Sequence, residues 1–230
     1  MLLSRRAGFT LTEILVVLGI IALLATIAFP AFNSVRRRSY QTTCSSNLKQ
    51  LGLAISLYSQ DNDELFPRGG DPTDLQTDAW QTAAGGVYEF QVDQLPPLTY
   101  VLQPYIKNRE LWHCPADSGF DIGDISGQPL DAQPSSYAKF GMSYYYRTEL
   151  TLKRKKDLLG WDRQTPPQEH GPSEINVLAD GHGSWHGQDE PWSLRRYNVL
   201  MGDGHVVNFT RKQLKDAWRL NLDGPTPSTP

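Results

Sequence analysis

The segment from Phe9 to Phe32 constrains this chain most strongly, because it is almost entirely apolar and Glu13 is its only charge. As an α-helix of about 24 residues it would be about 36 Å long, enough to cross a hydrocarbon core of about 30 Å. A charged side chain costs about 2.5–3.5 kcal/mol at the centre of a membrane helix on insertion scales. We therefore expect Glu13 to have a functional partner.

A cleaved secretory signal and a plain membrane anchor are two alternative interpretations of this stretch. A cleaved secretory signal has a shorter apolar core followed by small residues, whereas the run here is longer and its flank, residues 28–32, is bulky. A plain membrane anchor gives Glu13 no role. Each alternative therefore leaves part of the sequence unexplained.

The residues around Glu13 form a recognisable string, Gly8-Phe9-Thr10-Leu11-Thr12-Glu13, behind a short basic leader. It resembles the cleavage and methylation motif of type IV prepilins and type II secretion pseudopilins. The resemblance implies cleavage between Gly8 and Phe9 by a membrane-embedded prepilin peptidase on the cytoplasmic side, followed by N-methylation of Phe9. It also implies that Glu13 pairs with the Phe9 ammonium of a neighbouring subunit, which would offset the cost of an isolated carboxylate in hydrocarbon.

Pro30 falls where many members of that family carry a helix-kinking proline. Because proline removes one backbone hydrogen bond and clashes with the preceding turn, we expect a local bend or melted turn there. The cations that flank the apolar segment, at positions 5–6 and 36–38, do not by themselves favour one membrane orientation. The family resemblance implies a cytoplasmic N-terminus, a single-pass inner-membrane precursor and a periplasmic head.

A second pattern predicts that the helix continues beyond the membrane segment. Apolar residues recur at spacings of four and three on one helical face, namely Cys44, Leu48, Leu51, Ile55 and Tyr58. Leu53, Ala54 and Leu57 are expected to broaden this face, and the polar run 61–64 followed by Pro67 ends the helix. We therefore predict an α+β, pilin-like fold, in which a long N-terminal helix packs with its second half on a C-terminal antiparallel β-sheet.

The predicted organisation has five parts: a prepilin leader (1–8), a transmembrane assembly helix (9–32), its amphipathic continuation (33–64), a globular head (65–222) and a disordered tail (223–230). Residues 67–97 are predicted to form an extended surface loop with room for a short strand at 86–92. The later elements are a short helix at 98–106, strands at 143–148, 175–179, 198–201 and 205–209, a hairpin turn at 202–204, and a last helix from Thr210 to about Trp218.

The C-terminal part resembles a large bacterial subgroup of prepilin-like proteins whose ectodomain ends in histidine, nine residues and Asp-Gly. The matching stretches are 44–54, 104–108, 114–117 and 198–206. One position departs from this pattern, because Ser193 stands ten residues before Asp203 where the subgroup has histidine. His170 does stand ten residues before Asp180, but that earlier strand fits the pattern less well. We therefore assign no role tied to the histidine of this pattern.

Cys44 and Cys114 are the two cysteines of the chain. In an exported domain, two cysteines favour a disulfide. The bond would close a loop of about 70 residues, contribute on the order of 4 kcal/mol in the chain-entropy model, and staple the head to the helix. Two free buried thiols are the alternative.

Candidates for a metal site are weak. Asp180 and Asp203 could supply oxygen ligands to calcium, although their spacing matches no specific calcium loop and Asp-Gly pairs are typical of turns. His182 and His186 have the i, i+4 spacing that binds zinc on a helix, but the glycines around them argue against a helix. We predict surface-loop histidines and no cofactor, with calcium left open.

The sequence shows no nucleophile elbow, phosphate loop or paired-carboxylate motif. A formal charge of −3 does not suggest nucleic-acid binding. We therefore predict a structural, non-enzymatic subunit that polymerises through its N-terminal helix into a type II secretion pseudopilus or a type IV pilus-like filament. Its expected partners are the prepilin peptidase, identical or related pilin subunits and an inner-membrane assembly platform. The alternative is a membrane-anchored periplasmic binding or metal-dependent domain.

Overall fold

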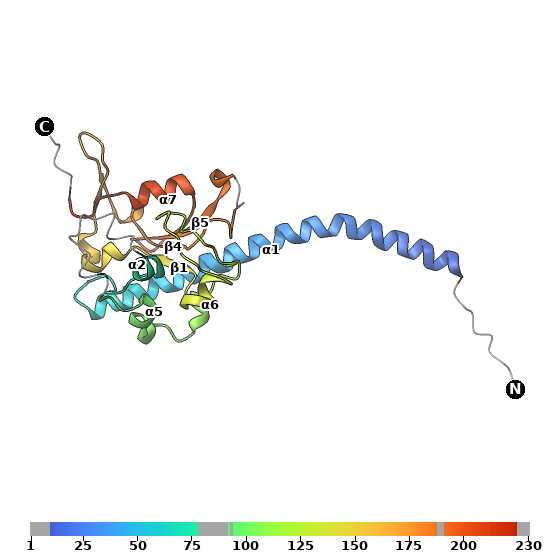
Figure 1. The fold of residues 1–230 in the computed structure, drawn as a ribbon, viewed down its shortest axis with the longest axis horizontal. Helices are drawn as coiled ribbons and strands as arrows, with labels where there is room; N and C mark the ends of the chain where they lie inside the picture. Colours follow the sequence, from blue (N-terminus) through green and yellow to red (C-terminus); the bar gives the residue numbers. More distant parts are fainter. Residues whose placement is uncertain (1–9, 78–91, 93, 188–190, 225–230) are drawn as a thin grey trace. The chain divides into compact units, whose positions relative to one another are not determined.

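The computed structural model describes residues 10–77, 92, 94–187 and 191–224. Helix α1 (Leu11–Asp61) is continuous, and the chain divides into two compact units between Ser39 and Tyr40. The first unit contains the first part of α1, and the second is the head, which includes the rest of α1 (Figure 1). The melted turn expected at Pro30 is absent, because the loss of one backbone donor does not interrupt a helix that is formed on both sides of it.

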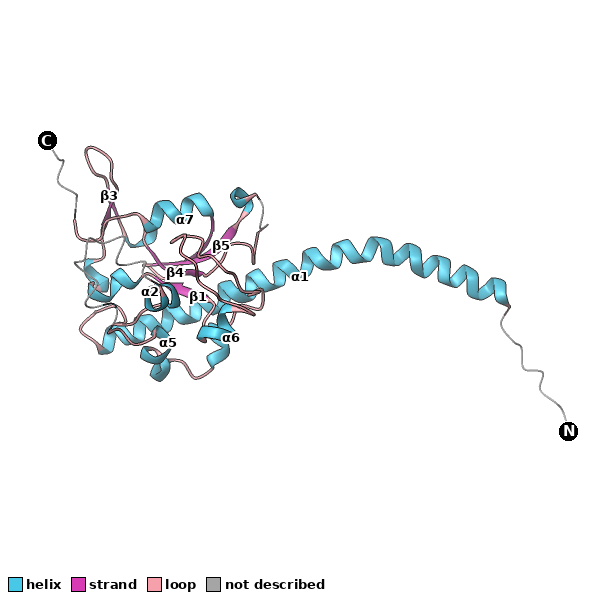
Figure 2. Ribbon diagram, viewed as in Figure 1, coloured by secondary structure: helices cyan, strands magenta, loops and turns pink. Residues whose placement is uncertain are grey.

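Short elements build the head around one four-stranded sheet (Figure 2). The strands run antiparallel in the order β1 (Tyr144–Tyr146), β4 (Asn176–Asp180), β5 (Arg196–Met201) and β6 (Val206–Thr210), and β2 (Gly160–Trp161) pairs separately with β3 (Glu169–His170). The α-helices of the head are α2 (Pro72–Gln76), α5 (Leu98–Val101), α6 (Ser136–Phe140) and α7 (Arg211–Trp218). The 3₁₀ turns are η1 (Gln103–Tyr105), η2 (Arg109–Trp112), η3 (Thr148–Leu152), η4 (Lys155–Asp157), η5 (Pro172–Glu174) and η6 (Trp192–Leu194).

The sheet lies between two helices, the head part of α1 on one face and α7 on the other (Figure 1). Successive side chains of a strand point to opposite faces. Leu200 of β5 accordingly joins the core cluster of α1, whereas its neighbours Val199 and Met201 pack with Leu214 of α7. The predicted helix on an antiparallel sheet is confirmed, and α7 adds a third layer.

The apolar face of α1 is buried where the spacing predicts it. Cys44, Leu48 and Leu51 are fully buried, and Gly52 lets the helix approach the sheet, since a Cβ there would lie 2.9 Å from Cδ1 of Leu200. The expected broadening of this face is wrong for Leu53 and Leu57, which are 66% and 49% exposed. At about 100° per residue, both point away from the Cys44–Tyr58 face.

The C-terminal hairpin and helix form as predicted. In the turn between β5 and β6, the Gly204 amide donates to the Met201 carbonyl over 2.9 Å, and Gly204 takes a φ of 93° that favours glycine. Helix α7 begins with a reciprocal capping box, in which the Thr210 hydroxyl accepts from the Gln213 amide and the Gln213 side chain accepts from the Thr210 amide.

The predicted surface loop at 67–97 is wrong at its start. Residues 69–73 are buried, and the carbonyls of Pro67 and Gly69 accept hydrogen bonds from the Thr151 hydroxyl. Polar composition suggested exposure here, but the head supplies buried donors that satisfy the backbone. The predicted strand at 86–92 falls outside the described residues except for Val92, and most of the predicted tail, residues 225–230, also falls outside them.

Arg147 is an organising residue that the sequence does not reveal. Its guanidinium is fully buried and donates to the carbonyls of Ala217 and Leu220, over 3.0 and 2.6 Å, and to Oδ1 of Asn176. It also pairs with Glu149. Burial lowers the pKa of Arg147 from its ordinary value. The side chain therefore fixes the C-terminal end of α7 to the sheet.

Replacing Arg147 with methionine is expected to destabilise the head by about 3 kcal/mol, because two buried carbonyls lose their donors. The melting temperature should fall by roughly 6–12 °C, as followed by near-UV circular dichroism of the full chain in detergent. Lys153→Met is the matched control, since it removes a partly exposed cation that pairs with Asp223, close in sequence to the Leu220 carbonyl that Arg147 binds. Loss of this exposed pair should cost less than about 1 kcal/mol. Equal melting of the two variants would contradict the role given to Arg147.

Candidate functional site

The start of α1 places Glu13 in a hydrogen-bonded cap. The backbone amide and the hydroxyl of Thr10 each donate to the Glu13 carboxylate over 2.8 Å, and the Glu13 amide donates to the Thr10 hydroxyl over 3.3 Å. This is a capping box, which satisfies donors that every helix N-terminus leaves open. The Thr-x-x-Glu spacing is the signal that could have predicted it. Gly8 and Phe9 lie outside the described residues.

The first part of α1 is apolar and exposed. Residues 11–29 form a helix long and apolar enough to cross a membrane, and none of it is buried within the chain. Leu11, Ile27 and Phe29 are each about 70–80% exposed. A helix that is apolar on all sides requires an apolar environment, which lipid or other apolar helices supply. This part of α1 is therefore suited, by its length and composition, to an apolar environment of this kind.

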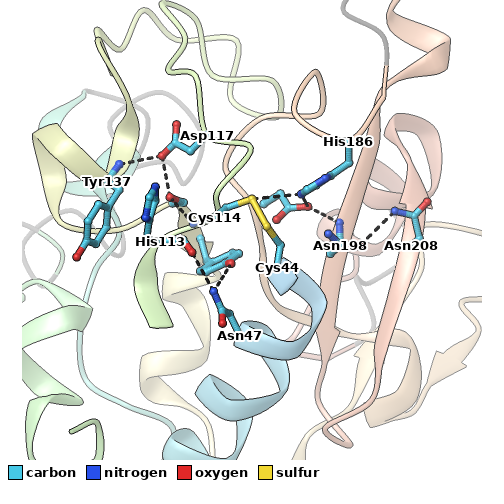
Figure 3. The surroundings of a disulfide bond; sticks show 12 residues. Cys44, Asn47, His113, Cys114, Asp117, Tyr137, His186, Asn198 and Asn208 are labelled. Atoms are coloured by element: carbon cyan, nitrogen blue, oxygen red, sulfur yellow. Dashed lines mark hydrogen bonds and ion pairs between the residues drawn. A yellow bond between two sulfur atoms is a disulfide. The ribbon is translucent and has the colours of Figure 1, made fainter. Parts of the chain in front are cut away.

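A disulfide joins Cys44 of α1 to Cys114, which follows η2 (Figure 3). Both cysteines are fully buried. One turn further along α1, the amide of Asn47 donates to the carbonyl of His113 over 2.9 Å and to the hydroxyl of Tyr144 over 3.3 Å. The predicted pairing is thus present, and a side-chain hydrogen bond reinforces the same attachment of the head to the helix.

Asp117 orders the loop that carries Cys114. Its oxygens accept hydrogen bonds from the amides of Gly119, Ser136 and Tyr137 and from the hydroxyl of Ser143. The Ser143 hydroxyl in turn accepts from the Cys114 amide over 3.1 Å. Asp117 belongs to the stretch 114–117 noted in the sequence, but only the fold shows that its carboxylate supports the disulfide.

The imidazole of His186 points at the disulfide from the side opposite Asp117 (Figure 3). Its Nε2 lies 3.3 Å from Sγ of Cys114 and 3.4 Å from Oδ2 of Asp180. Burial lowers the pKa of His186 to about 4 and raises the pKa of Asp180 to about 8. Asp180 also accepts from the backbone amide of Asn198 over 2.5 Å. The histidine and the carboxyl group therefore form a buried pair with no net charge near neutral pH.

The prediction of surface-loop histidines is wrong for His182 and His186, whose side chains are only 9% and 0% exposed. Glycines let their loop lie directly against η6 and β5, since a Cβ at Gly183 would lie 2.5 Å from Cζ of Tyr197 in β5 and one at Gly187 would lie 2.3 Å from the Leu194 carbonyl oxygen in η6. Those glycines indicated the lack of a helix, and they also permit the close packing that buries the imidazoles.

A second buried polar group fixes the same loop. Asp124 accepts hydrogen bonds from Arg195, from the Tyr197 hydroxyl and from the Gly183 amide, the last over 2.9 Å. The ring of His182 stacks on Phe120 at 5.2 Å between centroids. Burial first, and then the negative charge of Asp124, raises the pKa of Tyr197. This cluster positions the loop that carries His186.

The two calcium candidates are not brought together. Asp180 ends β4 beside Asn198, whereas Asp203 lies in the β5–β6 turn beyond Met201, where it pairs with His205 over 2.6 Å. Ser193 lies in η6, before the start of β5. Among the described residues, the side chains with ligand atoms close enough to hold one metal ion are Cys44, Cys114 and His186, whose ligand atoms lie within 4.8 Å of one another.

Comparison with known proteins finds matches at the N-terminal region and over a limited length. Residues 3–29 match the model of the prokaryotic N-terminal methylation motif. The chain is 41% identical over 59 residues to the type IV major pilin protein PilA of Myxococcus xanthus (strain DK1622). That alignment covers 26% of this chain and 27% of the relative, so the chain spans about a quarter of the length of the relative it matches. No solved structure matches the chain.

Proposed function

We propose that this chain, which matches the prokaryotic N-terminal methylation motif over residues 3–29, is a structural subunit of a filament. The subunit is cleaved after Gly8, N-methylated at Phe9, and assembled through α1 into a type IV pilus-like or type II secretion pseudopilus filament. The observation that carries the proposal is the methylation motif at residues 3–29, directly followed by an exposed apolar helix. The role is structural rather than catalytic.

The build of the head supports this role. The same helix that leaves its apolar first part exposed is held in the head by a core face, a disulfide and the Asn47 amide. A force on the filament would therefore pass from α1 into the head through covalent and packed contacts. A disulfide also fits a head that is exported to an oxidising compartment, with the N-terminus on the cytoplasmic side of the inner membrane.

Glu13 gives the proposal a mechanism. Before assembly its carboxylate caps its own helix through Thr10. Cleavage after Gly8 creates an ammonium group at Phe9, and a neighbouring subunit can present that cation to Glu13. An ion pair in hydrocarbon offsets the desolvation of both charges, whereas uncleaved chains lack the cation. Assembly therefore follows processing by a prepilin peptidase, and the further partners are related subunits and the inner-membrane assembly platform.

Intact mass and N-terminal sequencing of the native protein test the processing step. We expect a mature chain that begins at N-methylated Phe9. Replacing Gly8 with aspartate should leave the leader attached, since it changes the residue at the cleaved bond, and the precursor should remain in the membrane. A native protein that retains Met1 to Gly8 would refute the proposal and favour a plain membrane anchor.

A further inference from the structure

The disulfide lies beside two buried polar side chains, those of His186 and Asp180, which a covalent cross-link does not require. The side chain of His186 is fully buried, and its Nδ1 has no hydrogen-bond partner among the described residues. The same holds for Oδ1 of Asp180. A buried polar group without a partner costs about 1–3 kcal/mol. An apolar side chain packed against the two sulfurs would avoid that cost, so the pair suggests a further use of this site.

The donor atoms match a soft metal site. Sγ of Cys44, Sγ of Cys114 and Nε2 of His186 lie within 4.8 Å of one another, and they come from α1, from the loop after η2 and from the loop after β4. Two thiolates and an imidazole are a preferred zinc donor set, with Zn–S near 2.3 Å and Zn–N near 2.0–2.1 Å. Ligand atoms at those distances in a tetrahedron are roughly 3.5–3.8 Å apart, close to the 3.3 Å between Cys114 Sγ and His186 Nε2.

We propose that the chain in its dithiol state, as it is synthesised and before Cys44 and Cys114 are joined, binds one Zn²⁺ through these two thiolates and Nε2 of His186. Two S–H bonds break, two Zn–S bonds form, and both protons pass to solvent without electron transfer. The sulfurs need to lie only roughly 1.5–2 Å further apart than in a disulfide. The Asp180 carboxyl group lies 3.4 Å from Nε2 of His186, so it would lie close to the bound Zn²⁺.

Zinc and the disulfide would then be alternative cross-links at one position. Each joins α1 to the segment at residues 113–114, so a metal would hold the head on the helix until the thiols are oxidised. The proposal does not depend on filament assembly, because it concerns the head alone and is tested on unassembled chains.

The test uses the full chain in detergent, kept reduced with a phosphine under anaerobic conditions, with Zn²⁺ or Co²⁺ as the probe. We expect one metal per reduced chain after gel filtration, an intense near-ultraviolet thiolate-to-cobalt absorption, and no binding by the oxidised chain. His186→Gln should weaken metal binding by tenfold or more. His113→Gln should bind like the wild type, because its ring stacks on Tyr137 and pairs with Glu110 instead.

In the binding measurements, the site would be overturned by a reduced wild-type chain that takes up no stoichiometric cobalt, or by His186→Gln binding as tightly as the wild type. Each variant is first folded in its oxidised form, verified by near-UV circular dichroism, and only then reduced, which separates loss of a ligand from failure to fold. Zinc should also raise the melting temperature of the reduced wild type by more than that of the reduced His186→Gln chain, because weaker binding stabilises less. Equal stabilisation of both would show zinc bound elsewhere.

Discussion

Glu13→Gln is expected to give a chain that is cleaved and methylated normally but does not form filaments. Glutamine can replace glutamate in a capping box, so the substitution keeps the helix cap with Thr10 and removes only the charge. In the proposed filament, the Phe9 ammonium of the neighbouring subunit would then have no counter-ion in hydrocarbon. Removing one partner of a buried ion pair costs about 3–5 kcal/mol, which lowers an association constant more than a hundredfold.

Thr10→Ala is the matched control, since it removes the hydroxyl that Glu13 accepts from and leaves the carboxylate in place. The loss of this N-cap should cost about 1 kcal/mol of helix stability and leave filaments that electron microscopy still detects. Sheared-filament yield and intact mass of the membrane fraction, measured for both variants, separate assembly from processing. Normal filaments from Glu13→Gln would refute the ion-pair mechanism.

Loss of the disulfide should have the second large effect, on the stability of the head. The bond joins residues 70 positions apart, and in the chain-entropy model its removal costs about 4 kcal/mol. Thermal unfolding of the reduced chain, in the presence of a chelator so that no metal replaces the bond, should occur roughly 8–16 °C below that of the oxidised chain.

A chain with both cysteines replaced by alanine supplies the control for this measurement. Its melting temperature should be as low as that of the reduced wild type and should not respond to reductant. Titration of denatured wild-type chains should find thiols only after reduction. A thiol count or melting temperature that reductant leaves unchanged in the wild type would refute the bond.

Local patterns account for the elements that could be predicted. The apolar stripe from Cys44 to Tyr58, the glycine-rich turn at 202–204 and the capping box at Thr210 each depend on residues close in the sequence. The spacing of side chains along a helix or strand is fixed, so such patterns identify a buried face without knowledge of the partner. The prediction is wrong for Leu53 and Leu57 because these apolar residues lie on the exposed face of the helix, opposite the buried face that the spacing marks.

The methylation motif and the membrane-length helix were determined by the sequence alone, because both are contiguous. Only the tertiary structure could decide what surrounds the cysteines. Arg147, Asp117, Asp180 and His186 contact groups far away along the chain, and polar residues of this kind are most often exposed. Their burial depends on long-range packing that places their partners at hydrogen-bond distance, and no local pattern specifies those partners.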